Sequence, residues 1–135
     1  MTQHASLTPQ RWARFTLDQQ ILQIGAEMHR ASASMARGDA PALRNGYERV
    51  LRLVDLTAQV SSGYRLRREL LRWRDLIAEL YLADQPNEAA HRAAFRSHVR
   101  MCVGPTERRV FLGRGALRCE PQRMLERAVV AEHCV

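Results

Sequence analysis

Residues 16–38 read TLDQQILQIGAEMHRASASMARG, and this stretch has the signals of one complete α-helix. Thr16-Leu-Asp-Gln19 is a capping box, in which the threonine and glutamine side chains satisfy backbone amides at the helix start. Gly38 is a typical stop, because glycine readily adopts the conformation that ends many helices. Between these points the apolar residues recur every three or four positions and share one helical face: Leu17, Ile21, Ile24, Met28, Ala31 and Met35.

A second helix is predicted from about residue 40 to residue 60, with Asp39 as its N-cap and Pro41 in its first turn. Its main apolar stripe consists of Leu43, Tyr47, Val50, Leu51 and Val54. A second strip, formed by Leu53, Leu56 and Val60, lies on nearly the opposite side. A helix that is apolar on two sides is either central in a bundle or used for self-association. The second alternative would make the protein an oligomer.

Two further helices follow. Ser61-Ser62-Gly63 interrupts the chain, and residues 64–82 predict a third helix. Its stripe consists of Leu66, Leu70, Trp73, Ile77 and Leu80. Asn87 can cap a fourth helix that runs to about Met101, with a thinner stripe.

The two ends of the chain carry less pattern. Thr8-Pro9 can start a short helical turn in which Trp12 and Phe15 pack together. Residues 104–135 are expected to form an appendage to a bundle made by residues 1–103. The predicted fold is all-α: a three- to four-helix antiparallel bundle with short loops and a weakly structured C-terminal tail.

Composition sets bounds on the class of protein. The chain has 135 residues, 46% of them hydrophobic, which suits a single globular domain. No stretch is long and apolar enough to span a membrane, and the N-terminus does not resemble a secretory signal, so we expect a cytoplasmic protein. The three cysteines lie in the last third without CxxC spacing. We therefore expect no disulfide framework and no zinc site. We also expect no cofactor.

The net charge of +7 comes from arginine alone, because the chain contains no lysine. The densest cluster is YRLRRELLRWR, residues 64–74. One interpretation is a ridge that binds RNA or single-stranded DNA. The residues of this ridge would be Arg65, Arg67, Arg68, Arg72 and Arg74, with contributions from Arg96 and Arg100. The alternative, which we favour, is a solvated helix face whose arginine stems cover the core and whose heads pair with nearby acids.

Two motifs suggest chemistry. Arg92 and His98 have the Arg-x5-His spacing of helical-bundle ribonucleases of the HEPN type, in which the histidine acts as acid or base. A satisfied core histidine is the commoner outcome at such a position. Glu88 and His91 match the ExxH spacing of ferritin-like metal sites. Those sites need a second copy of the motif, so we expect no metal here.

The acids of the first two helices allow a third kind of site. Glu48 and Asp55 are seven residues apart and share a helix face, which is compatible with a pair of catalytic carboxylates. Acids that lie near arginines across a helix seam more often form ion pairs that fix the register of the helices. The nearby arginines are Arg30, Arg49 and Arg52.

Residues 15–82 resemble a family of small uncharacterised prokaryotic helical-bundle proteins. The matching segments are IGAEMHRA at 24–31, YERVLRLVDLT at 47–57 and RRELLRWR at 67–74, against family patterns of the type IGxEvxRA, FERALELxDLT and R-x-K/R-E-L-x-R-x-R-E. The resemblance implies a helical fold and supplies no activity. It also identifies the positions at which the polar residues typical of the family occur, and these are Gly25, Glu27, Arg30, Glu48, Arg49, Asp55, Thr57, Arg72 and Arg74.

These observations lead to three ordered hypotheses of function. The first is a non-enzymatic interaction or accessory protein that associates with itself or with a protein partner. The second is an arginine-rich module that binds RNA or single-stranded DNA. The third is a metal-independent ribonuclease built on Arg92 and His98. None of the three involves a membrane.

Overall fold

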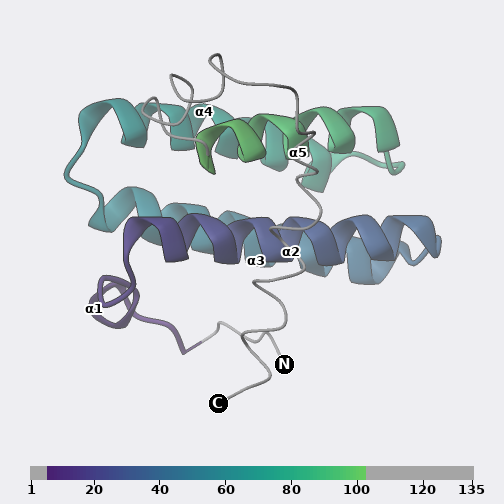
Figure 1. Cartoon of the computed structure of the whole chain (residues 1–135). Helices are drawn as coiled ribbons and strands as arrows, with labels where there is room; N and C mark the ends of the chain where they lie inside the picture. The colour runs from purple at the N-terminus through teal and green to yellow at the C-terminus, as the bar shows by residue number, and fades with distance from the viewer. Residues whose placement is uncertain (1–5, 103–135) are drawn as a thin grey trace, which may run out of the picture.

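The computed structural model of the chain describes residues 6–102. It contains a short helix, α1 (Pro9–Trp12), and four long ones: α2 (Leu17–Ala36), α3 (Ala40–Val60), α4 (Tyr64–Leu82) and α5 (Glu88–Cys102). Successive long helices run in opposite directions and form two layers, with α2 and α3 in one layer and α4 and α5 in the other (Figure 1). Each long helix packs against two others, and α1 packs against α3. The predicted antiparallel bundle is confirmed, with four long helices.

Local capping signals explain where the helices begin. Thr16 Oγ1 accepts from the Gln19 amide at 3.2 Å, and the Gln19 side chain accepts from the Thr16 amide at 2.8 Å. Asp39 accepts from the Ala42 amide at 3.0 Å to start α3, and Asn87 accepts from the Ala90 amide at 3.0 Å to start α5. The caps predicted from sequence are therefore confirmed.

Gly38 ends α2 with a φ of +70°, a conformation that glycine adopts without the steric cost of a side chain. A second glycine sets the distance between helices. A Cβ added at Gly46 would lie 3.3 Å from the Cβ of Ala31, so α2 and α3 approach closely at this point.

Helix α3 is the centre of the core. The main stripe is buried except for Leu51, which is partly buried, and Leu53 and Leu56 of the second strip are also buried, at 0% and 7% exposure. The alternative of a central helix is thus correct. The other alternative, a free apolar strip on α3 for self-association, is wrong because α1, α2 and α4 all pack against this helix.

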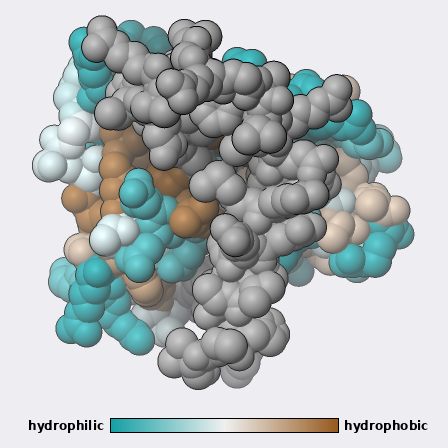
Figure 2. All heavy atoms as spheres, viewed as in Figure 1, coloured by the Kyte–Doolittle hydropathy of each residue, from teal (hydrophilic) through white to brown (hydrophobic). Residues whose placement is uncertain are grey.

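The start of the chain closes one end of the core. Trp12 is fully buried, and it packs against Phe15 as predicted, with the two rings 5.5 Å apart in an edge-to-face arrangement. Leu17, which was predicted to lie on the apolar face of α2, is 45% exposed in the first turn of this helix. Figure 2 shows hydrophobic atoms between the two layers at the end where α2 and α4 begin. The predicted appendage, residues 104–135, lies outside the described residues.

Within residues 6–102, no helix combines the length and the apolar character that crossing a membrane requires.

Candidate functional site

Glu27 joins α2 to α3. Its carboxylate is buried and accepts hydrogen bonds from Arg30 Nη1 at 2.6 Å and from Arg49 Nε at 2.9 Å. The two arginines remain partly exposed. Burying a carboxylate is costly unless it is paired and hydrogen-bonded, and both conditions are met here. Three of the positions marked by the sequence resemblance therefore form one ion-pair cluster that fixes the α2–α3 seam.

Other marked positions also make contacts within the bundle. Arg74 reaches from α4 to Asp55 on α3, where its Nε and Nη2 atoms donate to the two carboxylate oxygens. This hydrogen-bonded pairing raises the pKa of Arg74 above its ordinary value. Thr57 accepts from the indole nitrogen of Trp12 at 2.9 Å and donates to the Leu53 carbonyl at 2.8 Å. Gly25 is buried in α2.

The two carboxylates proposed as a catalytic pair have different surroundings. Glu48 and Asp55 line the same shallow hollow of about 440 Å³, beside Leu7 and Pro9. Asp55 is engaged by Arg74, and Glu48 is exposed. Both side chains are exposed, so the pair does not lie in an enclosed pocket of the kind that catalytic groups usually occupy.

Arg92 and His98 do not converge. His98 is 1% exposed and faces the core, where its ring lies 5.1 Å from that of Trp73. Burial lowers the pKa of His98 to about 4, against a smaller opposing effect of its hydrogen bond with the Ile21 backbone. Arg92 is exposed and forms an ion pair with Glu88. The structure therefore does not assemble the ribonuclease site suggested by their spacing.

His91 has a role that the sequence analysis missed. It is 3% exposed and connects three helices, because its Nε2 lies 2.7 Å from Ser32 Oγ on α2 and its Nδ1 lies 2.8 Å from the Tyr47 hydroxyl on α3. The Ser32 hydroxyl donates its one proton to the Met28 carbonyl at 3.0 Å. It must then accept from Nε2–H, which leaves Nδ1 to accept from Tyr47.

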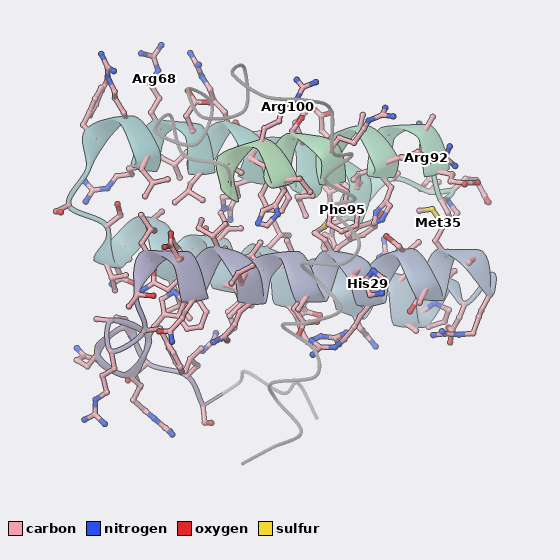
Figure 3. All side chains as sticks on the ribbon, in the orientation of Figure 1. His29, Met35, Arg68, Arg92, Phe95 and Arg100 are labelled. Atoms are coloured by element: carbon pink, nitrogen blue, oxygen red, sulfur yellow. The ribbon has the colours of Figure 1, made fainter. Side chains whose placement is uncertain are left out.

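Burial lowers the pKa of His91 and raises that of Tyr47 to about 12, so both groups are neutral at pH 7. The resulting chain of hydrogen bonds holds α5 against α2 and α3. A pocket of about 160 Å³ opens beside it, and Figure 3 shows two of its lining residues, Phe95 and Met35, between the layers. One signal for this role was available: His91 lies seven residues before His98, on the same face of α5.

The arginines of α4 divide into two groups. Arg67 and Arg74 face α3, where Arg67 donates to the carbonyls of Ala58 and Ser61 at the end of that helix. Arg65, Arg68 and Arg72 are exposed. Arg72 lies 3.3 Å from Glu69, and both of these side chains are more than half exposed. Within α4, Arg72 therefore pairs with a nearby acid as the favoured interpretation expects, whereas Arg67 and Arg74 bind groups of α3 instead.

The exposed group continues onto α5. Arg68 and Arg100 project away from the α2–α3 layer, as Figure 3 shows, and Arg96 is exposed as well. Among the described residues, Arg65, Arg68, Arg96 and Arg100 form no ion pair. Trp73, in contrast, is buried and donates to the Ala94 carbonyl at 2.8 Å, so it is a core residue.

The solvent side of α4 also carries large apolar groups. Leu71 and Leu76 are each 45% exposed, Leu82 is 71% exposed and Tyr64 is 75% exposed. Basic residues lie in the first half of this side and acidic residues in the second. We define the outer face of α4 as Tyr64, Arg68, Leu71, Arg72, Asp75, Leu76, Glu79 and Leu82. It is the most distinctive surface of the described bundle.

No protein-family model matches this chain, and comparisons with curated proteins and with solved structures give no match either.

Proposed function

We propose that this protein is a non-enzymatic interaction module that associates with itself through the outer face of α4. The observation that carries the proposal is the concentration of exposed apolar side chains on this one helix. Six large hydrophobic residues are strongly exposed in the described chain, and four of them lie on α4. Single exposed leucines are ordinary on a protein surface, whereas a group of them on one face favours a contact with another molecule.

The charges of the same face support a second copy as the partner. Arg68 and Arg72 precede Asp75 and Glu79 along the helix, so the face has one basic and one acidic half. A surface of this kind can complement itself when two copies meet in opposite directions. It has no such complementarity to a uniformly charged partner.

A pair of matched variants tests this proposal. Leu71 and Leu17 are both leucines with 45% exposure, but Leu71 lies on the outer face of α4 and Leu17 at the start of α2. In sedimentation experiments, Leu71→Glu should raise the dissociation constant of the oligomer at least about tenfold, while Leu17→Glu should leave it unchanged. Equal behaviour of the two variants would contradict the use of this face.

A second candidate function is binding of RNA or single-stranded DNA. It is favoured by one observation: Arg65, Arg68, Arg96 and Arg100 are exposed on neighbouring helices without an ion pair among the described residues. Tyr64, beside Arg65 and 75% exposed, supplies a ring on which a base can stack.

The salt dependence of binding, compared between variants, shows which arginines contact phosphates, because each contact contributes to the slope. If Arg96 and Arg100 each contact a single-strand phosphate, Arg96→Ala/Arg100→Ala should reduce the slope of log affinity against log salt by about 1.4. The control is Arg11→Ala/Arg14→Ala, which removes the same charge from exposed positions in and just after α1. Identical slopes for the two double variants would contradict binding at the α4–α5 face.

A further inference from the structure

We propose that two copies of this chain pair through α4 in antiparallel register, about a twofold axis at the level of the peptide between Trp73 and Arg74. This inference rests on the self-association proposed above and adds the orientation of the partner and the contacts that fix it. The geometry that points to it is a symmetric arrangement of charges on the outer face of α4.

The charged residues form a single row. Arg68, Arg72, Asp75 and Glu79 follow one another at spacings of four, three and four, which places them on one side of an α-helix. All four are exposed. Arg68 and Glu79 lie equally far from the proposed midpoint in opposite directions, and so do Arg72 and Asp75.

An antiparallel pair therefore places every charge opposite its complement. Arg68 of one copy lies opposite the partner's Glu79, and Arg72 lies opposite the partner's Asp75. The twofold axis generates each of these contacts twice. A parallel pair would instead place each residue beside its own equivalent, and the resulting like-charge contacts oppose that orientation.

These charged groups are available for such contacts. Among the described residues, Arg68, Asp75 and Glu79 take part in no ion pair, and Arg72 has only its exposed contact with Glu69. An ion pair between two solvent-exposed side chains is readily exchanged for another.

The apolar residues follow the same symmetry. Leu71 and Leu76 are equally far from the midpoint and lie on either side of the charged row, each 45% exposed. Around the axis, each leucine approaches its own equivalent in the partner and loses contact with water. The pair thus has a charged centre that sets the register and apolar flanks that contribute to affinity.

Compensating charge reversal within one chain tests the register. Arg68→Glu alone places two acids opposite each other in the antiparallel pair and should weaken dimerisation at least about tenfold. Arg68→Glu/Glu79→Arg keeps the net charge of the original chain and restores both contacts in the antiparallel pair, so its dissociation constant should return to that of the original chain. In a parallel pair this variant would still place like charges beside each other. The matched control Arg68→Glu/Asp75→Arg also keeps the net charge but places like charges at all four contacts, so it should remain weak. A reducing agent excludes disulfide exchange, and circular dichroism checks that each variant is helical.

The remaining outcomes separate the register from the proposed function. If the unaltered chain dimerises but Arg68→Glu/Glu79→Arg remains as weak as Arg68→Glu, the antiparallel register is overturned and self-association stands. If all three variants dimerise like the unaltered chain, association does not use the outer face of α4, and both proposals fall. A chain that stays monomeric without any substitution also overturns both.

Discussion

Glu27 shows how a single side chain connects sequence pattern, packing and stability. The carboxylate is buried where α2 crosses α3, and it receives hydrogen bonds from an arginine on each of these helices. A carboxylate in this place costs free energy by itself, so its contribution depends on both partners being present. The exposed pair of Glu69 and Arg72 has the same chemistry but no burial.

The buried carboxylate of Glu27 and the exposed one of Glu69 should therefore respond differently to the same substitution. Glu27→Gln should lower the free energy of unfolding by about 3 kcal/mol, because it leaves two guanidinium groups at a buried neutral amide. Glu69→Gln should change it by no more than about 0.5 kcal/mol, because exposed ion pairs contribute little. Urea denaturation of both variants checks this difference. Equal effects would mean that the burial of Glu27 does not matter energetically.

At the scale of elements, α5 differs from the other helices because two histidines fill part of its inner face. His91 is neutral in a chain of hydrogen bonds with Ser32 and Tyr47, and His98 is packed against Trp73. Burial lowers the pKa of both groups. We therefore expect the attachment of α5 to weaken as the pH falls.

The sign of this dependence follows from proton linkage. A histidine with a lowered pKa in the folded state binds fewer protons there than in the unfolded state. Such a histidine contributes fully to the free energy of unfolding above pH 6.5. This contribution is lost as the pH falls toward the folded-state pKa, which is about 4 for His98. Between these pH values the loss from His98 alone should be about 3 kcal/mol.

Comparison with His98→Phe isolates this contribution from that of the carboxyl groups. We expect the free energy of unfolding of the unaltered chain to fall more steeply between pH 6.5 and 4 than that of the variant. Urea denaturation at a series of pH values measures the two curves. Parallel curves would show that His98 does not titrate differently in the folded state.

Helices α3, α4 and α5 illustrate which features the sequence could predict and which it could not. The ends of α3 and α4 were predictable because Asp39, Ser61 and Gly63 act on their immediate neighbours. The inward position of His91 depends on Ser32 and Tyr47, which lie 59 and 44 residues away in the chain. Likewise, nothing near Arg67 indicated that its guanidinium would bind carbonyls at the end of α3. Contacts of this kind require the packed bundle.

At the scale of the whole molecule, the bundle turns a dispersed set of charges into distinct surfaces. Ion pairs across the α2–α3 and α3–α4 seams use Glu27 and Asp55, whereas the α4–α5 layer presents an exposed set of its own: Arg65, Arg68, Arg96 and Arg100. The strip of α3 that sequence reasoning offered for self-association is buried, and the outer face of α4 is the exposed alternative.

The size of this face limits the affinity that it can provide. Helix α4 has 19 residues and is therefore about 28 Å long at 1.5 Å per residue. A contact between two such helices is smaller than a standard stable interface, so we expect a dissociation constant in the micromolar range or above. Its ion pairs should make it weaker at high salt.

Sedimentation equilibrium from about 1 µM to about 1 mM protein, at low and at high salt, is the decisive test of self-association because it gives the mass of the protein in solution. Self-association through α4 should raise the mass from the monomer value of 15.5 kDa toward twice that value, with the transition at higher concentration in high salt. A mass that remains at 15.5 kDa over the whole range would contradict it.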